Sequence, residues 1–182
     1  ILDEEDVRSG RVPVIAPAGF MAHTVAENVY AGNAMNRRLF YQYGLLLPSD
    51  PHGYVGQGLG HRVSAGTSSL IAPTRHVEQP IEEFEVDGVW MVFQNTPNTE
   101  APREMNTYLP EWKALWMAEN VIASLHNIYT LRGAQVRDPL NWSKYINEAL
   151  YRFGFEAEVV FASHHWPRWG NARIQEVLRA QR

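Results

Sequence analysis

The sequence TPNTEAP at residues 96–102, together with MAEN at residues 117–120, decides how this chain is interpreted. Each segment follows an apolar run and carries one carboxylate, Glu100 in the first and Glu119 in the second. A Glu placed after a strand, beside Pro or Asn, lies in a loop that can point it into a cleft. A hairpin is expected between the two segments. The sequence therefore predicts two acidic loops, each at the end of a strand.

A third polar cluster follows the apolar run Val159–Phe161, in the sequence SHHWP at residues 163–167. If the three apolar runs are strands of one sheet, two Glu and a His would meet at one edge of it. Carboxylate oxygen and imidazole nitrogen are both zinc ligands. Glu100, Glu119 and His164 are therefore candidate ligands of a metal site.

The same residues also fit ordinary structural roles. Glu119 could cap a helix that starts near Asn120. Glu100 could be a solvated loop residue, as most Glu are. Of the adjacent His164 and His165, at least one is expected to be structural. Spacing alone leaves the metal site and these roles open.

The composition sets the class of protein. A length of 182 residues predicts one domain. The net charge of −4 gives no reason to expect nucleic acid or an anionic membrane as a partner. The absence of cysteine excludes disulfides and thiolate zinc sites. No run of 18 or more apolar residues predicts a membrane span. The start at Ile1 suggests processing or a piece of something longer.

Hydrophobic periodicity and turn residues predict the elements. Helices are expected at residues 1–10, 20–30, 31–47, 121–131, 138–153 and 171–180. Strands are expected at residues 12–17, 68–73, 84–86, 89–93, 104–109, 113–117 and 158–162. Asp87-Gly88 and Pro110-Glu111 mark two hairpins. The order of elements predicts a layered α/β fold in one domain.

Several local signals sharpen this map. Gly133 is expected to stop the helix at 121–131, and Asp138 to cap the next helix with Pro139 at its first position. The inner faces of two helices are predicted to carry Met35, Leu39 and Tyr43, and Leu140, Ile146, Leu150 and Phe153. The Gly-rich residues 48–66 predict a long loop that forms an active-site wall.

Two further polar residues lie near the acidic loops in the sequence. On the expected helix, His126 would be about two turns beyond Glu119 and could reach the same cleft. A His on a helix is more often a surface or core residue than a catalyst. Arg132 could bind an anion through two hydrogen bonds, or it could complement the helix C-terminus.

Several segments of the chain resemble the alkylsulfatases of the metallo-β-lactamase superfamily, the bacterial enzymes that hydrolyse dodecyl sulfate and similar esters. The resemblance covers nearly the whole chain. It is carried by AENVYAGNAMNRR at 26–38, GQGLG at 56–60, TEAP at 99–102, MAEN at 117–120, LRGA at 131–134 and ASHHWP at 162–167.

The resemblance implies an αββα sandwich with two zinc ions. It implies that Glu100 binds one zinc, that Glu119 bridges both and that His164, rather than His165, is a terminal ligand. It further implies that His126 donates a proton to the leaving alcohol and that Arg132 contacts the sulfate. By the same resemblance, a segment lining the substrate pocket contains Tyr30 and Asn33. Ligand type alone leaves manganese and iron open beside zinc.

One departure from the family changes the expectation for this chain. The His-x-His-x-Asp-His motif, which supplies the other four of seven ligands, is absent. Residues 1–182 are therefore expected to be the C-terminal part of the catalytic domain, without the dimerisation and lipid-carrier-like domains of the family. By itself the chain is expected to bind zinc weakly and to hydrolyse no alkyl sulfate, with His23, His52 and His61 the first replacements to consider.

The resemblance also sets expectations for the full-length protein. It implies a homodimer in the periplasm or outside the cell, acting on an alkyl sulfate. Aromatic residues around Tyr54 and Trp166 could bind the alkyl tail or could belong to the core. The competing interpretation is a non-catalytic α/β fragment or binding module that keeps the fold without a complete metal site.

Overall fold

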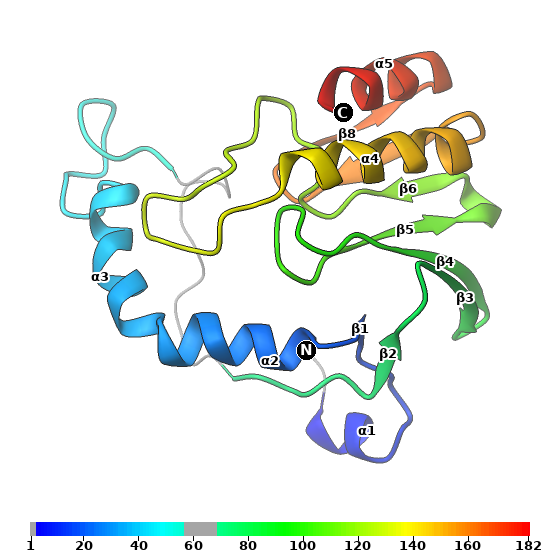
Figure 1. Cartoon of the computed structure of the whole chain (residues 1–182), viewed down its shortest axis with the longest axis horizontal. Coiled ribbons are helices and arrows are strands. Elements are labelled where there is room, and N and C mark those ends of the chain that lie inside the picture. Colours follow the sequence, from blue (N-terminus) through cyan, green and yellow to red (C-terminus); the bar gives the residue numbers. More distant parts are fainter. Residues whose placement is uncertain (1–2, 57–68) are drawn as a thin grey trace.

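The computed structural model describes residues 3–56 and 69–182 of the chain. Figure 1 shows the elements in chain order. The helices are α1 (Glu4–Arg8), α2 (Phe20–Val25), the π-helix η1 (Ala26–Tyr30), α3 (Gly32–Gln42), the 3-10 turn η2 (Pro110–Trp112), α4 (Pro139–Ala149), the π-helix η3 (Leu150–Gly154) and α5 (Asn171–Gln181). The strands are β1 (Ile15–Pro17), β2 (Arg75–Val77), β3 (Ile81–Val86), β4 (Val89–Asn95), β5 (Met105–Leu109), β6 (Ala114–Trp116), β7 (Val159–Ala162) and β8 (His165–Trp169).

The main sheet has six strands in the order β3-β4-β5-β6-β7-β8. Its neighbours are antiparallel except β6 and β7, which pair in parallel. The β3–β4 hairpin turns through Asp87 and Gly88, both at positive φ, as the sequence predicts. Because β4 and β6 are both antiparallel to β5, they point the same way, and β7 points with them. The carboxyl ends of these three strands therefore lie at one edge of the sheet.

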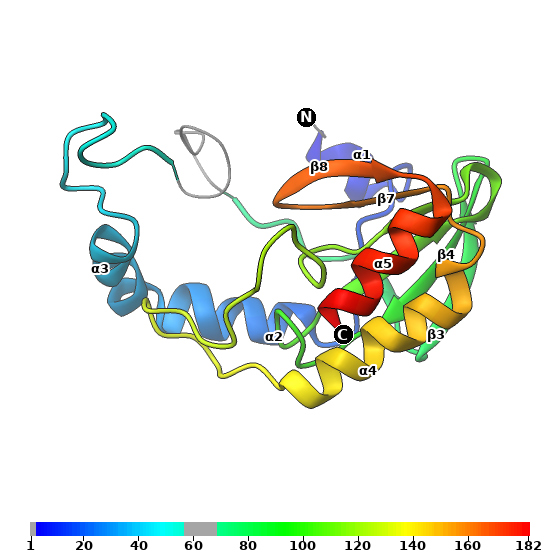
Figure 2. The ribbon, with the colours of Figure 1, turned by 90° about the horizontal axis from the view of Figure 1, so that it is seen from above.

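Helices α4 and α5 cover one face of this sheet (Figures 1 and 2). The chain leaves β6, passes through α4 and returns in β7, a crossover that allows the parallel pairing. Asp138 caps α4 by accepting a hydrogen bond from the Asn141 N–H, with Pro139 at the first position. Fully buried side chains from both layers form the core, among them Leu115, Val160, Ile146, Leu150, Ile174 and Leu178.

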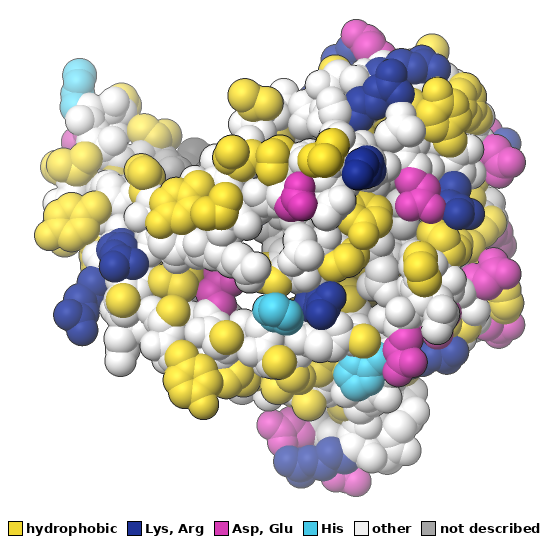
Figure 3. Space-filling model, viewed as in Figure 1, with side chains coloured by type: hydrophobic (Ala, Val, Ile, Leu, Met, Phe, Trp, Pro, Cys, Tyr) yellow, Lys and Arg dark blue, Asp and Glu magenta, His cyan; other side chains and the backbone are white. Residues whose placement is uncertain are grey.

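The segment α2–η1–α3 extends away from the sheet (Figures 1 and 2). The short strands β1 and β2, beside the start of α2, pair in parallel as a separate two-stranded sheet (Figure 1). Apolar side chains gather on the surface of this arm (Figure 3). Those exposed along it include Val29, Tyr30, Phe40 and Tyr41, and Leu46 and Leu47 are exposed just after it. Of the predicted stripe, Met35 is buried and Leu39 and Tyr43 are half-buried.

Two of the predicted elements are wrong or misplaced, and one predicted inner-face residue is wrong. Residues 121–131 form no helix, and the chain from 117 to 138 is a loop. No strand covers the described part of 68–73, and the strand of this region is β2, which begins two residues after Pro73. Leu140 is exposed, so it does not belong to the inner face of α4. Strand β8 was not expected from the sequence.

The Gly-rich loop is described only in part. Residues 57–68 lie outside the described residues, which includes His61 and most of the GQGLG motif. Within the described ranges, no helix has the length and apolar character needed to cross a bilayer.

Candidate metal centre

The three predicted polar loops converge at one edge of the main sheet. Glu100 follows β4, Glu119 follows β6 and His164 follows β7. Pairing between β6 and β7 continues past the strands, because the Met117 N–H donates to the Phe161 carbonyl and the Ser163 N–H donates to the Ala118 carbonyl. These bonds place the residues that follow, Glu119 and His164, opposite each other. The convergence expected from the sequence is confirmed.

The side chains in this cluster are close enough to share a cation. Ligand atoms of Glu100, Glu119 and His126 all lie within 4.8 Å of one another. His164 Nε2 is 3.0 Å from Glu119 Oε2. Glu119 is therefore the central group, in reach of the other carboxylate and of both imidazoles. Of the adjacent pair, His164 and not His165 meets Glu119.

Unusual backbone conformations direct the two carboxylates into the cluster. Ala118 has φ of 46° and Asn98 has φ of 62°, both in the left-handed region. Asn tolerates this region, whereas Ala adopts it at a cost of about 1–3 kcal/mol. The Ala118 carbonyl also accepts the bond from Ser163 that holds β7. The strain at Ala118 is thus maintained by the pairing that brings Glu119 to His164.

Arg137 is a residue of this site that the sequence analysis missed. Its guanidinium donates to the Glu100 carboxylate and to the Glu100 backbone carbonyl. It also donates to the backbone carbonyl and the side chain of Asn127. Arg137 has 7% of its side chain exposed, and Glu100 has 13%. One buried cation therefore joins the Glu100 loop to the loop that carries His126.

Burial sets the ionisation of these groups. Desolvation raises the pKa of Glu100, and Glu119 raises it further, whereas Arg137 opposes both effects. Desolvation lowers the pKa of His126, which favours the neutral imidazole. Its Nδ1 lies 2.8 Å from the Asn127 carbonyl, and its ring packs at 5.1 Å against Trp142. His126 lies on a loop, so its expected place on a helix is wrong, although its approach to Glu119 is confirmed.

The cluster opens into a cavity of about 630 Å³. The three predicted ligands, Glu100, Glu119 and His164, line it. So do the two other predicted polar residues, His126 and Arg132, and the newly found Arg137. Leu39, Tyr43 and Ile122 supply apolar walls. Arg132 pairs with Glu27 of η1 at 3.3 Å, and its backbone N–H donates to the Gln42 side chain at 2.7 Å. The arm and the site loop are thereby joined beside the cavity.

Other predicted residues are not brought to this cavity. Tyr30 is 85% exposed and Asn33 is exposed, and neither lines it. Trp166 is 88% exposed, which rules out a place in the core, and Tyr54 is half-buried. Their expected contacts with substrate stay predictions.

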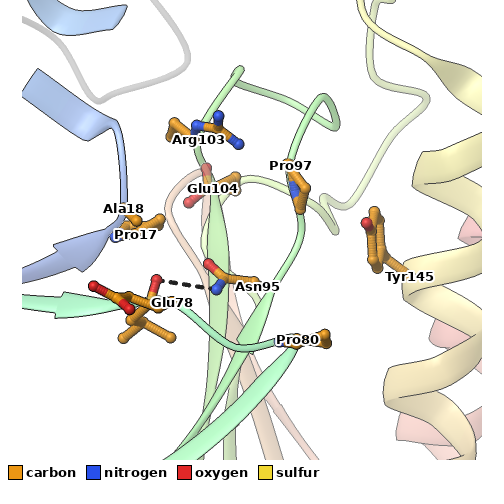
Figure 4. A pocket seen from close by; sticks show the side chains of 10 residues that line it. Pro17, Ala18, Glu78, Pro80, Asn95, Pro97, Arg103, Glu104 and Tyr145 are labelled. Carbon is orange, nitrogen blue, oxygen red and sulfur yellow. Dashed lines mark hydrogen bonds between the residues drawn. The ribbon is translucent and has the colours of Figure 1, made fainter. Parts of the chain in front are cut away.

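A third carboxylate lies behind the cluster. Glu104 lines a second cavity of about 250 Å³ together with Arg103 and Asn95 (Figure 4). Desolvation raises the pKa of Glu104 to about 7, despite a hydrogen bond from the Met105 N–H. Glu100 and Glu119 add to this rise through their negative charge. The region thus concentrates three acidic groups.

We expect Glu104→Gln to stabilise the metal-free protein at pH 8 relative to wild type. The folded-state pKa of about 7 is above the ordinary 4.5, so ionised Glu104 destabilises the fold at high pH. The advantage of Gln should disappear as pH falls from 7 towards 4.5. Its upper limit is about 3 kcal/mol, at about 1.4 kcal/mol per pKa unit. Urea unfolding at pH 5 and pH 8 with a chelator measures the difference in free energy of unfolding between Glu104→Gln and wild type. An equal difference at the two pH values would contradict the prediction.

The donor set fits a divalent metal ion. Two carboxylates and two imidazoles meet within reach of one another, and imidazole and carboxylate suit zinc and its neighbours. Burial first and the negative charge of Glu119 second raise the pKa of Glu100, and a cation between the two carboxylates would offset their repulsion. The arrangement is unfavourable for carboxylates alone and favourable with a positive charge between them.

The chain is similar over its whole length to known proteins, although no protein-family model matches it. It is 51% identical to a linear primary-alkylsulfatase from Pseudomonas sp. over all 182 residues, which are 27% of that protein. It superimposes on the stereoselective inverting sec-alkylsulfatase Pisa1 from Pseudomonas sp. with a TM-score of 0.95 and 43% identity, covering 100% of this chain and 29% of the other. A metallo-β-lactamase superfamily protein from Sulfolobus tokodaii gives 0.55 at 17% identity, covering 97% and 60%.

These similarities establish the fold. The sheet and its helices are part of a metallo-β-lactamase-type domain, as the resemblance implies. The chain spans about a quarter of the length of the curated relatives it matches.

Proposed function

We propose that this chain, homologous throughout its length to alkylsulfatases, belongs to the catalytic domain of a zinc-dependent hydrolase of alkyl sulfate esters. The products would be an alcohol and sulfate. The observation that carries the proposal is the convergence of Glu100, Glu119, His126 and His164 on one cavity. Two zinc ions, the stoichiometry that the family resemblance implies, would supply a bound water of lowered pKa and a positive charge for the ester oxygens.

The position of each charged residue around the cavity supports a particular role. Glu119, the central group, would bridge the two zinc ions, with Glu100 as a ligand on one side and His164 on the other. Arg137 orients Glu100 by holding both its carboxylate and its backbone carbonyl. Arg132 borders the cavity and would contact the sulfate, with Glu27 fixing its guanidinium.

His126 has two roles that its geometry supports. It lies within 4.8 Å of both carboxylates, as a metal ligand would, and its lowered pKa favours the neutral form that ligands need. It also lines the cavity, together with Arg132, the residue proposed to contact the sulfate. We propose the second role, donation of a proton to the leaving alkoxide.

We expect His126→Ala in the full-length protein to lower turnover of alkyl sulfates by about 10²-fold, the scale of general acid catalysis. Activated aryl sulfates should lose much less, because a phenolate leaves without protonation. Zinc content should stay near that of wild type. Turnover of dodecyl sulfate and nitrophenyl sulfate, with metal analysis, measures all three. An equal loss for both esters together with loss of zinc would make His126 a ligand instead.

The proposed function is tested on the purified full-length protein. We expect about two zinc per chain, the binuclear stoichiometry, and release of sulfate from dodecyl sulfate that a chelator stops and zinc restores. Absence of metal and of hydrolysis would favour the non-catalytic alternative. Restoration by manganese or iron but not by zinc would keep the reaction and change the metal.

Two further proposals concern the full-length protein. A periplasmic or extracellular location and a homodimer are supported by the resemblance to the alkylsulfatases alone. Cell fractionation and sedimentation would test them.

A further inference from the structure

A row of buried polar side chains lies directly behind the two acidic loops. Gln94 and Thr96 of the β4 segment, Asn106 of β5 and Asn120 after β6 are each at most 2% exposed. Gln94 and Asn106 are direct partners in the antiparallel register, at positions where a sheet interior ordinarily holds apolar residues. We call these four residues the amide row.

The amide row is continuously hydrogen-bonded. Asn106 Nδ2 donates to Gln94 Oε1 at 2.9 Å. Asn120 Nδ2 donates to Asn106 Oδ1 at 2.8 Å and to Thr96 Oγ1 at 3.0 Å. At its outer end, Gln94 Nε2 donates to Glu148 of α4 at 3.0 Å. The row therefore links three strands to one helix.

Its inner end is joined to both carboxylate loops. Asn120 directly follows Glu119 in the chain, and its carbonyl accepts from Trp142 Nε1 at 2.9 Å. The Thr96 carbonyl accepts from Thr99 Oγ1 at 2.7 Å, which closes the turn leading into Glu100. The bond between Asn120 and Thr96 thus ties the start of one acidic loop to the residue after Glu119.

Such a tie opposes the repulsion between the carboxylates. Glu100 and Glu119 repel each other, so without a cation their loops would gain by separating. An apolar interior could stabilise the sheet as well, but it could not fix the two loops through directional bonds. Buried hydrogen-bonded networks make a unique arrangement rigid. The side-chain amide nitrogens of the row each donate to a partner, whereas Asn120 Oδ1 has no hydrogen-bond partner among the described residues.

We propose that Thr96 and Asn120 are positioning residues, which hold Glu100 and Glu119 at the separation that metal binding requires. This inference rests on the proposed function, because it assigns these residues a role in forming the same site. Neither residue is among those that line the cavity of the metal centre. They act through the backbone of the loops that they join.

Three single variants of the full-length protein separate positioning from stability. Thr96→Val keeps the shape of the side chain and removes the acceptor for Asn120. Thr96→Ser keeps the hydroxyl. Asn95→Ala is the matched control, because Asn95 is the neighbour of Thr96 and donates two hydrogen bonds, to the Val77 and Gln79 carbonyls, away from the site.

We expect Thr96→Val to weaken zinc binding by about tenfold, the loss typical of removing a residue that orients a ligand. The kcat for dodecyl sulfate should fall by a similar factor with KM little changed. Thr96→Ser should restore both. Asn95→Ala should lower the melting temperature but leave zinc affinity and kcat near those of wild type.

The measurements are zinc affinity by competition with a chelator, kcat and KM, and thermal unfolding. If the zinc affinity of Thr96→Val is within twofold of the zinc affinity of Asn95→Ala, the inference is overturned. If Thr96→Val does not fold, Thr96→Ala replaces it with the same two outcomes. A wild-type protein without zinc or activity would refute the proposed function, and the inference with it. If the wild type is fully active and Thr96→Val has normal zinc affinity and kcat, the inference is refuted and the proposed function stands.

Discussion

Glu119→Ala should abolish zinc-dependent hydrolysis of alkyl sulfates by the full-length protein. Glu119 is the central group of the cluster, within 4.8 Å of Glu100 and His126 and 3.0 Å from His164. If it bridges two ions, its loss removes a ligand from both. Zinc content should fall below one ion per chain, and release of sulfate from dodecyl sulfate should fall below detection. Zinc analysis and the rate of sulfate release measure this effect.

The fold should survive this substitution. The Glu119 side chain is 35% exposed, and its replacement removes negative charge from a region crowded with it. Glu111→Ala is the matched control, because Glu111 is an exposed Glu at the turn of the same β5–β6 hairpin. It should leave zinc and turnover unchanged. Normal zinc content and turnover in Glu119→Ala would rule out the bridging role.

The convergence of the acidic loops could be predicted because it depends on strand order. Pro110-Glu111 marks the hairpin that joins β5 to β6, and the short connection from β4 to β5 gives a second antiparallel pair, so β4 and β6 point the same way. A long connection containing a helix then makes β7 parallel to β6. Local signals therefore fix which strand ends share an edge, and with them the positions of Glu100, Glu119 and His164.

The loop from 117 to 138 could not be predicted in the same way. Residues 121–131 have the composition of a helix, but Leu125 is 95% exposed and Leu131 is 79% exposed. Tertiary contacts override local propensity here. Arg137 is central to them, because it donates to Asn127 and Glu100 and its backbone N–H donates to the Ile128 carbonyl.

The position of Arg137 in the sequence could have indicated its role. It stands directly before Asp138 and Pro139, whose capping of α4 fixes where the loop ends. A cation at such an anchored position, following two acidic loops in the chain, is a candidate partner for one of them. The burial of the pair, which decides its importance, follows only from the tertiary structure.

Arg137→Met should destabilise the metal-free protein by about 3–5 kcal/mol at pH 7, the cost of breaking a buried ion pair. Methionine keeps much of the apolar contact of the Arg side chain, so the loss isolates the charge and its hydrogen bonds. Those bonds join Glu100 to the loop carrying His126, and Glu100 would then be buried beside Glu119 with its main cation removed. Urea unfolding in the presence of a chelator measures the effect.

The pH dependence identifies the cause of this loss. Without Arg137, the pKa of Glu100 should rise further above its ordinary 4.5, because Arg137 lowers it in the wild type. A carboxyl with a raised folded-state pKa destabilises the fold above that pKa and ceases to do so once protonated. The difference between Arg137→Met and wild type should therefore shrink as pH falls through the raised pKa towards 4.5. Arg132→Met is the control, because the Arg132–Glu27 pair is more exposed and should contribute about 1 kcal/mol or less. Equal losses for the two variants, or a loss at Arg137 that does not change with pH, would show that the buried pair does not hold the Glu100 loop in place.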